Sequence, residues 1–373
     1  MTTNRFTNAL RLLFTIKPKQ KLTAQYLLAL VIAVALAFLV GAGIMWIVGY
    51  DPIQCYGALF QGALGKPRAL GNTLAKTATL CLTGLAMSVA AKAGIFNVGG
   101  EGQLYFGGLA AAVVGARLSG APAWVVIPCA LIAAMLAGGL YAWVPGILKV
   151  KLKVDEVVTT ILLNSAAIYL CSYLANGPLK TTERGISSGT DSVAASFAPL
   201  IRLSNLNGSV FVAAAAALLI WYLMTRSTAG FAMKITGSNP RFAFYGGIRA
   251  DRLMIAGMVI SGMLCGLVGM IEVFGIHKRF IVNLSAGYYF DGMLVAMIMR
   301  YQPFGVILMS FFFAILTIGG SAMELSAGIS SEVILIVQAV IIFCMAAEGG
   351  IRQSLRAFAA RRRVRRARGK EAA

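Results

Sequence analysis

Two glycine-rich stretches place amide and carboxylate side chains beside backbone that cannot continue a regular helix. Residues 94–103 read GIFNVGGEGQ, and residues 283–292 read NLSAGYYFDG. Each stretch joins two short apolar segments. Backbone of this kind is costly at membrane depth unless it is buried in protein or lines a cavity. We therefore predict that these stretches, called here the first break and the second break, interrupt helices at points where polar chemistry can take place.

Five side chains in the two breaks are candidates for contact with a polar solute: Asn97, Glu101, Gln103, Tyr289 and Asp291. The two amides can donate and accept hydrogen bonds, which suits a polar substrate, and bracing of adjacent helices is an equally open role. A carboxylate within a membrane indicates function by default. The alternatives are that Glu101 hydrogen-bonds local backbone and that Asp291 satisfies free N–H groups at a helix start.

No arrangement of residues in the sequence points to catalysis or to a bound cofactor. The phosphate-binding loop motif is absent, so the chain is not expected to bind ATP itself. The six cysteines are scattered singly and His277 is the only histidine, which argues against a metal site or a disulfide framework. His277 is expected to be a solvated loop residue. Lys76, a charge within an apolar run, is expected to snorkel or to pair with an acid. We predict that the chain is not an enzyme.

The elements that carry these residues follow from a composition typical of a membrane-embedded chain. Of 373 residues, 59% are hydrophobic and 12% are charged, which is more apolar surface than a soluble domain can bury. We predict an all-α, polytopic helical membrane protein with about ten transmembrane segments, at residues 22–50, 70–91, 102–116, 118–148, 157–179, 203–225, 253–271, 280–299, 301–323 and 333–347. The first segment is too long for a signal peptide and lacks a cleavage site, so it is expected to remain as a span.

The distribution of charge predicts the orientation of these segments. The net charge of +20 is gathered in short stretches between apolar runs. By the positive-inside rule both chain ends are cytoplasmic, so the number of spans is even: ten, or eight if two short segments are re-entrant. Residues 1–21 form a basic cytoplasmic N-terminus, residues 22–350 the transmembrane domain, and residues 351–373 a basic cytoplasmic tail that is expected to bind anionic membrane lipids and no nucleic acid.

A weak internal match relates the two breaks to each other. Residues 105–109 align with residues 289–293, and Ala112 then aligns with Ala296. Duplication with an interrupted helix in each half points to a transport pathway. Chance similarity between apolar sequences is the alternative explanation.

The most distinctive stretch outside the predicted spans is residues 226–252, on the predicted cytoplasmic side. Asn239 and Pro240 form a strong helix start, because asparagine caps free N–H groups and proline suits the first turn. The helix is expected over residues 240–245, ended by two glycines. It would present three aromatic side chains: Phe242, Phe244 and Tyr245. Such an apolar knob indicates a partner's groove, and a helix resting on the membrane surface is the alternative.

Four stretches of the sequence resemble the permeases of bacterial nucleoside and simple-sugar importers of the ATP-binding cassette (ABC) class, which include branched-chain amino acid and ribose-type permeases. The first break resembles the signature FN-hydrophobic-G-x-EGQ. Residues 154–164 (VDEVVTTILLN) resemble NEVISTIMLN, with Asp155 where asparagine is usual. Residues 237–248 (GSNPRFAFYGGI) resemble GxNPxAAxYAGI, with Phe242 and Gly246 in place of alanines. Residues 287–292 (GYYFDG) resemble the start of GxGFDGIAVAL.

The resemblance implies a subunit of the bacterial inner membrane that works with separate proteins. A second, homologous permease, expected to be a different chain, would pair with it.

 An ATPase with two nucleotide-binding domains and an extracytoplasmic solute-binding protein would complete the importer. The ATPase would hydrolyse ATP, and this chain would bind no cofactor. The two breaks would flank the path of a nucleoside or simple sugar. A coupling helix in the ATPase groove would include Asn239, Pro240, Arg241, Phe242, Tyr245 and Gly247.

A secondary transporter driven by an ion gradient is the alternative from another class. It would use Glu101 or Asp291 as the ion carrier. The breaks hold more amides and aromatic rings than charges, which favours a small, neutral, polar solute over ion coordination.

Overall fold

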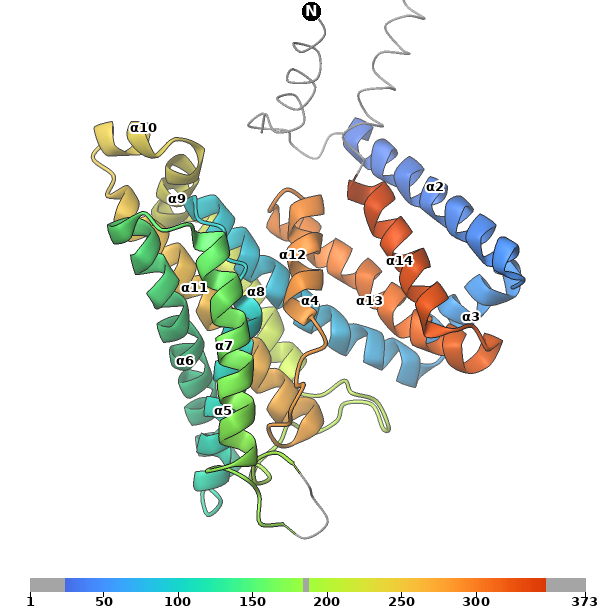
Figure 1. The fold of residues 1–373 in the computed structure, drawn as a ribbon, viewed down its shortest axis with the longest axis horizontal. Helices are drawn as coiled ribbons and strands as arrows, with labels where there is room; N and C mark the ends of the chain where they lie inside the picture. Colours follow the sequence, from blue (N-terminus) through green and yellow to red (C-terminus); the bar gives the residue numbers. More distant parts are fainter. Residues whose placement is uncertain (1–23, 184–187, 347–373) are drawn as a thin grey trace, which may run out of the picture. The chain divides into compact units, whose positions relative to one another are not determined.

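The computed structural model of the chain describes residues 24–183 and 188–346. Within these ranges the chain consists of helices joined by turns and loops, without a β-strand, and one isolated bridge pairs Pro199 with Asn207. The predicted all-α class is confirmed (Figure 1). The basic segments predicted at residues 1–21 and 351–373 lie outside the described residues.

The chain divides into two compact units, each of which is described by itself. Of the described residues, the first unit contains 24–41 and 339–346, and the second contains 42–338. The first unit is therefore the larger part of α2 (Ala24–Val48) and the second half of α14 (Ser331–Ala346). Every candidate residue from the sequence lies in the second unit, so the site is described within that unit.

The second unit holds the remaining helices in a simple chain order. All are α-helices except η1, a π-helical turn that continues α11 directly, and π turns of this kind often mark functional positions. They are α3 (Pro52–Leu64), α4 (Pro67–Ala93), α5 (Gly100–Arg117), α6 (Ala123–Leu152), α7 (Glu156–Asn176), α8 (Ser209–Arg226), α9 (Thr228–Ser238), α10 (Pro240–Tyr245), α11 (Ala250–Ile271), η1 (Glu272–His277), α12 (Tyr288–Ile298) and α13 (Pro303–Ala327).

Seven helical ranges in the described chain are long and apolar enough to cross a membrane: Val31–Val48, Pro67–Ala93, Ala123–Leu152, Glu156–Asn176, Ser209–Arg226, Ala250–His277 and Pro303–Ala327. α12 and α14 are apolar but shorter. The predicted polytopic helical membrane protein is confirmed, whereas the number of about ten spans stays a prediction. The second break explains part of the difference, because the predicted segment 280–299 is helical only from Tyr288 and α12 has 11 residues.

Glycines bring α5, α6 and α11 into close contact. A Cβ added at Gly107 would lie 2.2 Å from the Cα of Gly266, and one at Gly138 would lie 2.3 Å from the carbonyl oxygen of Gly262. Helices that approach this closely leave no room for a side chain between them. The close packing fixes α5, which begins at the first break, against two long neighbours.

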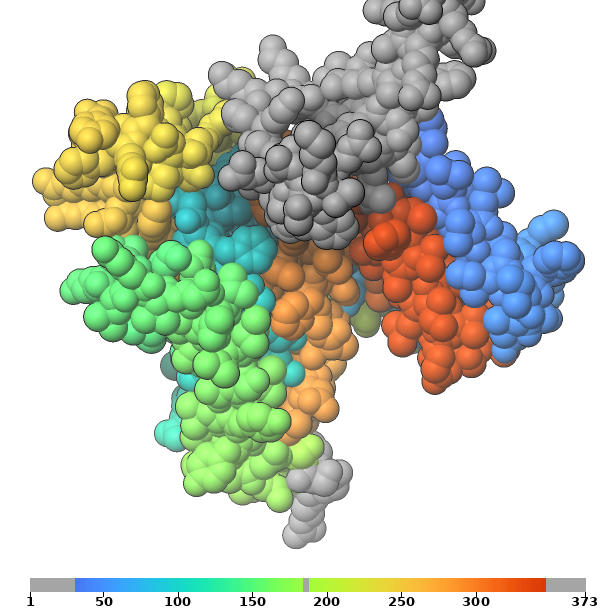
Figure 2. All heavy atoms as spheres, turned by 45° about the horizontal axis from the view of Figure 1, so that its top comes forward, coloured from blue at the N-terminus to red at the C-terminus, as the bar shows by residue number. Residues whose placement is uncertain are grey.

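Two polar segments lie at opposite ends of the group formed by α5, α6, α7 and α11. α9 and α10 project from one end, and the long connection between α7 and α8 lies at the other (Figures 1 and 2). The contacts agree with this view: Gly94, after α4, packs on Gly237 of α9, whereas Ala194 of the connection donates a backbone hydrogen bond to Gly115 of α5. This is the arrangement expected if the two segments lie on opposite sides of a membrane.

Candidate functional site

The first break is a turn of non-helical chain between α4 and α5, as predicted. α4 ends at Ala93, and Gly94 follows in the left-handed conformation with φ of 86°, which ends a helix without the strain a side chain would bring. α5 begins at Gly100, so residues 95–99 lie outside any helix. The break therefore exposes backbone donors and acceptors that need partners within the protein.

The amide pair of the first break satisfies itself and a neighbouring helix. Asn97 Nδ2 donates to Gln103 Oε1 at 2.8 Å and to Ser261 Oγ of α11 at 2.8 Å. Gln103 Nε2 donates back to Asn97 Oδ1 at 3.1 Å, and the same oxygen accepts from the Gly99 N–H at 2.9 Å. Both amides are buried. This geometry supports the bracing role, and direct contact of these amides with a solute stays a prediction.

The second of the four resembling stretches, residues 154–164, holds the first break in place. Asn164 Oδ1 accepts from the Gly102 N–H at 2.8 Å, and Asn164 Nδ2 donates to the Val98 carbonyl at 2.8 Å. Thr160 Oγ1 accepts from the Val98 N–H at 3.3 Å. The sequence analysis did not single out Thr160 or Asn164, although both lie in a stretch that it quoted.

Asp155, the departure from the usual asparagine, caps α7. Its Oδ1 accepts from the N–H groups of Val157 at 2.9 Å and Val158 at 3.1 Å. Aspartate and asparagine cap helices about equally well. The departure therefore leaves the start of α7 intact.

The second break is non-helical chain that ends where α12 begins. Gly287 has φ of 85° and precedes Tyr288, whose N–H donates to Ser285 Oγ at 3.1 Å. Asp291 lies in the first turn of α12 and is half-buried. The first N–H groups of the helix are thus met by side-chain acceptors, and Asp291 lies at the end of the helix that favours negative charge.

The two breaks are fastened to each other by hydrogen bonds in both directions. The carboxylate of Glu101, in the first break, accepts from the N–H of Tyr289 at 3.2 Å. The hydroxyl of Tyr289 donates to the Asn97 carbonyl at 2.5 Å, and the hydroxyl of Tyr105 donates to the Ser285 carbonyl at 3.4 Å. Glu101 therefore binds backbone, as one alternative held, but the backbone belongs to the other break.

Close packing accompanies these hydrogen bonds. A Cβ added at Gly100 would lie 2.0 Å from the Tyr289 ring, so only glycine leaves space for that ring. Tyr289 is fully buried. The structure thus brings together four of the five predicted site residues, Asn97, Glu101, Gln103 and Tyr289, with Asp291 two residues further along α12.

A lysine packed on an aromatic ring lies beside the second break. Lys76 Nζ of α4 lies 3.2 Å from the centroid of the Tyr288 ring. The charges of Glu272, Asp291 and Glu101 act on this ammonium. Lys76 was expected to pair with an acid or to snorkel, and the structure places it against an aromatic face without an ion pair among the described residues. Ionisable groups at such depth normally face a polar cavity or the protein interior.

Glu272 was missed by the sequence analysis, which ended the predicted span at residue 271. It begins the π turn η1, and its side chain is buried. Its Oε1 accepts from Thr79 Oγ1 of α4 at 2.9 Å, and His277 Nε2 lies 4.0 Å from its Oε2. The expectation that His277 is a solvated loop residue is therefore wrong: it ends the π turn, half-buried, beside this acid. An acid directly after an apolar run was the signal available in the sequence.

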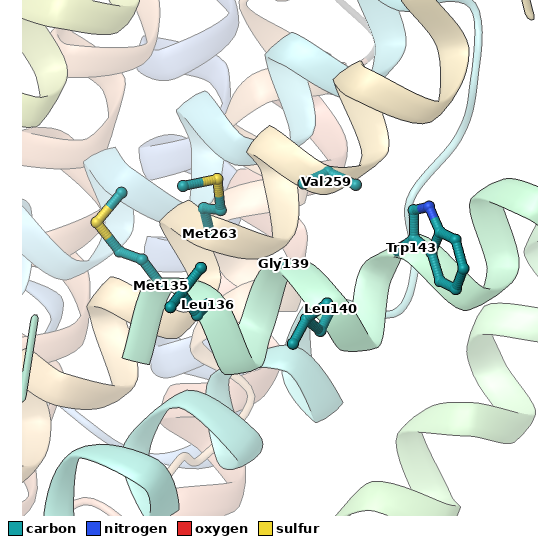
Figure 3. A pocket seen from close by; sticks show the side chains of 7 residues that line it. All are labelled: Met135, Leu136, Gly139, Leu140, Trp143, Val259 and Met263. Carbon is teal, nitrogen blue, oxygen red and sulfur yellow. The ribbon is translucent and has the colours of Figure 1, made fainter. Parts of the chain in front are cut away.

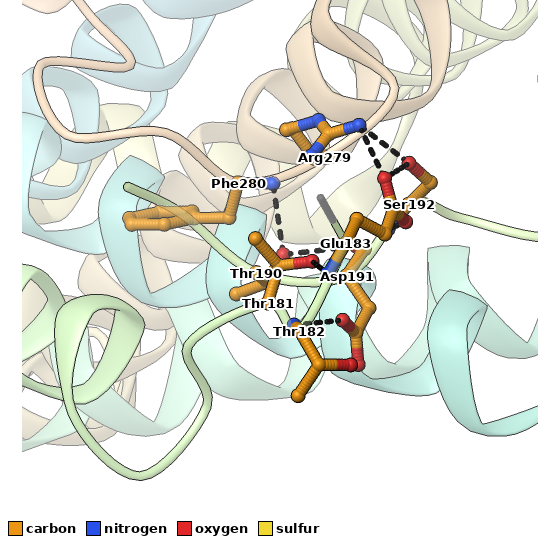
Figure 4. A network of polar contacts seen from close by, with 8 residues as sticks. All are labelled: Thr181, Thr182, Glu183, Thr190, Asp191, Ser192, Arg279 and Phe280. Carbon is orange, nitrogen blue, oxygen red and sulfur yellow. Dashed lines mark hydrogen bonds and ion pairs between the residues drawn. The ribbon is translucent and has the colours of Figure 1, made fainter. Parts of the chain in front are cut away.

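The long connection between α7 and α8 is tied to the chain that enters the second break (Figure 4). Arg279 Nη2 pairs with Glu183 Oε2 at 3.0 Å and donates to Ser192 Oγ at 2.6 Å. The Phe280 N–H donates to Thr190 Oγ1 at 3.1 Å. Hydrogen bonds from the backbone and hydroxyl of Ser192, and then Arg279, lower the pKa of the Glu183 carboxyl.

The predicted short helix in residues 226–252 is confirmed, and a second helix, α9, precedes it. α10 covers Pro240–Tyr245, and the Asn239 side chain caps it by accepting from the Phe242 N–H at 3.0 Å. Gly247 follows with φ of 76°. The aromatic side chains of α10 are exposed, by 64% at Phe242, 73% at Phe244 and 86% at Tyr245. α10 itself lies at one edge of the second unit (Figure 2).

An apolar cavity of about 180 Å³ lies between α6 and α11 (Figure 3), and no residue of either break lines it. Its lining is Met135, Leu136, Gly139, Leu140, Trp143, Val259 and Met263. Polar solutes need several converging polar groups to fix their orientation. This cavity does not offer them, so the polar breaks remain the candidate site.

The fold and the site define a polytopic helical membrane protein whose polar centre consists of two interrupted helices fastened together. The chain belongs to the family described as the permease component of the branched-chain amino acid transport system, whose model matches residues 69–346. It is accordingly a transport component and not an enzyme.

Relatives similar over most of the chain are named as permease proteins of ABC transporters. The guanosine permease protein NupP of Bacillus subtilis strain 168 is 35% identical, over 88% of this chain and 95% of its own. The nucleoside permease protein NupB of Lactococcus lactis subsp. cremoris is 34% identical, over 84% and 89%. The glucose permease protein TsgB13 of Haloferax volcanii is 32% identical, over 84% and 85%. No solved structure matches. These similarities confirm the ABC permease resemblance and give no support to the ion-gradient alternative.

Proposed function

We propose that this chain is the transmembrane permease of an ABC importer that carries a nucleoside. The similarity to the guanosine permease protein, at 35% identity over 88% of the chain, is the observation that carries the substrate class. A simple sugar is the second candidate, because a glucose permease protein is 32% identical. Both solutes are neutral and polar, which suits breaks rich in amides and aromatic rings.

The solute path runs beside the second break. Asn97, Gln103 and Tyr289 are buried and bonded to one another or to backbone, so they shape the wall. Glu101 joins the two breaks and keeps α12 in position. Asp291 is only half-buried on α12, and it is the one of the five residues proposed to meet the solute directly.

α10 docks in a groove of the ATPase and transmits the movement of the ATPase to the solute path. The six residues at this contact are the cap of α10, four residues on it and the second glycine after it: Asn239, Pro240, Arg241, Phe242, Tyr245 and Gly247. The exposure of Phe242 and Tyr245 supports a partner, because soluble faces seldom leave such rings uncovered. The ATPase hydrolyses ATP, and this chain binds no cofactor. Closure of the ATPase would then rock the helices that α9 contacts.

The importer contains further subunits on both sides of the membrane. A second, homologous permease pairs with this chain; Bacillus subtilis has a second guanosine permease protein, NupQ, that is 23% identical over 68% of this chain. An extracytoplasmic protein delivers the solute. Both chain ends are cytoplasmic in the bacterial inner membrane, where the basic residues of 351–373 meet anionic lipid.

Uptake into proteoliposomes tests the proposal. The chain is reconstituted with its partner permease and ATPase, and the loaded binding protein is added outside. We expect ATP-dependent accumulation of radiolabelled guanosine that persists when an uncoupler is added at constant ATP. Accumulation of leucine but neither guanosine nor glucose would overturn the substrate class, and uptake abolished by the uncoupler alone would overturn the ABC mechanism.

A further inference from the structure

The face of the Tyr288 ring is covered by a cation from another helix. Lys76 is ten residues into α4, so it lies roughly 14 Å from the start of that helix. Its Nζ is 3.2 Å from the ring centroid, and both residues are half-buried. A half-exposed aromatic face within a membrane protein is a surface on which a nucleobase can stack. The ammonium occupies the place that such a base would take.

A second position for the same ammonium lies close by. Glu272 Oε2 is buried and has no hydrogen-bond partner among the residues that the structure describes. Its other oxygen is held by Thr79, three residues after Lys76 and therefore on the same face of α4. A buried carboxylate oxygen left without a partner is costly, and an ammonium is its natural complement. Within the described chain, Lys76 forms no ion pair shorter than 4.0 Å, so this complement is unused.

The two positions differ in what they leave open. With the ammonium on Tyr288, the ring is covered and Glu272 Oε2 has no hydrogen bond among the described residues, with only His277 Nε2 nearby at 4.0 Å. With the ammonium at Glu272, the carboxylate is paired and the ring face is free. Asp291 lies on the same helix as Tyr288, three residues further along, and its charge also acts on the ammonium.

We propose that the Tyr288 ring is the stacking surface for the base of the transported nucleoside, and that Lys76 covers it until the solute moves the ammonium to Glu272. The inference rests on the proposed nucleoside substrate. It adds a binding surface, Tyr288, and two specificity-determining partners, Lys76 and Glu272, none of which belongs to the five residues predicted from the sequence. Lys76 competes with the base for the face of the Tyr288 ring. Neither Lys76 nor Glu272 therefore needs to contact the solute.

Equilibrium binding of radiolabelled guanosine to the purified complex of both permeases and the ATPase, without binding protein, tests this exchange. Glu272→Gln removes the second position, so guanosine should bind about five-fold more weakly. Lys76→Met/Glu272→Gln removes the competitor and leaves no unpaired charge at Glu272, so guanosine should bind more tightly than to the wild type. Tyr288→Phe keeps the ring and should bind as the wild type does, whereas Tyr288→Leu should lose binding. Lys66→Met, at the exposed start of the same helix, is the matched control.

Thermal unfolding of each variant complex separates binding effects from loss of fold, and the neutral double variant guards against a single variant that fails to assemble. The exchange is overturned if Glu272→Gln weakens guanosine binding as much in a Lys76→Met background as in the wild type. It is also overturned if the double variant binds no more tightly than the wild type, or if Tyr288→Leu binds guanosine normally. Failure of the proposed substrate looks different: the wild-type complex would bind neither guanosine nor glucose while ATP drives uptake of another solute, and the inference would fall with it.

Discussion

The first break and the second break have similar sequences but are held in different ways. In the first, Asn164 of α7 and the side chain of Asn97 bond the non-helical backbone. Gln103 of α5 and Ser261 of α11 in turn hold the Asn97 side chain, and these side chains are buried. In the second, the chain relies on Ser285 and on Glu101 from the other break, and Tyr288 and Asp291 stay half-exposed. The first break therefore serves as a fixed frame, whereas the second break presents its polar groups to the solute.

The largest expected effect comes from placing the same change in both breaks. Asn97→Asp puts a carboxylate where two donors now serve Gln103 and Ser261, and should lower the free energy of unfolding by about 3 kcal/mol or more. Asn283→Asp, at an exposed position with φ of 61° that aspartate tolerates, should change it by less than about 0.5 kcal/mol. Thermal unfolding of the purified protein measures both. Equal losses would remove the distinction between frame and presenting surface.

A smaller effect is expected where the two breaks meet. Gly100→Ala places a methyl group 2.0 Å from the Tyr289 ring and should cost about 1–3 kcal/mol of stability. Gly57→Ala in α3, where nothing lies within 4 Å of the added carbon, is the control and should be neutral or slightly stabilising. Combining Gly100→Ala with Tyr289→Leu should recover part of the loss in the same unfolding assay. An additive double variant would show that the two breaks do not press on each other.

Neutralising one acid in each break should separate stability from transport. Glu101→Gln keeps an acceptor for the Tyr289 N–H but loses the charge-assisted bond, which should cost about 1 kcal/mol. Asp291→Asn should leave the unfolding midpoint nearer the wild type and lower the initial rate of guanosine uptake more than Glu101→Gln does. Unfolding and uptake measured on the same preparations decide this. The reverse order would assign the solute to the first break.

The smallest effect concerns the connection that leads into the second break. Glu183 has a lowered pKa in the folded chain, so its stabilising contribution is complete above the ordinary value of 4.5 and is lost as the pH falls through the folded value. Proteolysis of the connection should therefore be slow at neutral pH and faster below pH 4.5. Glu183→Gln should be cleaved faster at neutral pH and should respond less to acid. A wild-type cleavage rate that does not change with pH would argue against a stabilising ion pair between Glu183 and Arg279.

Local patterns were enough to predict the interruptions and α10 with its cap at Asn239. They were not enough to show which break touches which, since the Glu101 to Tyr289 contact joins residues 188 positions apart. The same holds for Thr79 and Glu272, which are 193 positions apart. Periodicity and capping report on neighbours in the chain, whereas a buried charge finds its partner through the fold. Glu272 escaped notice for a further reason, because it lies one residue past the apolar run that defined the span.

The short length of α12 affects the free energy that a solute needs to cross the membrane. Its 11 residues rise roughly 16 Å, about half of the hydrocarbon thickness of a bilayer. The chain before it carries polar backbone that must be wetted or buried, so the insulating layer at this point is thinner than elsewhere around the protein. A neutral solute entering here would shed its water over a few helical turns, and an ion would still face a steep electrostatic penalty over the same short distance.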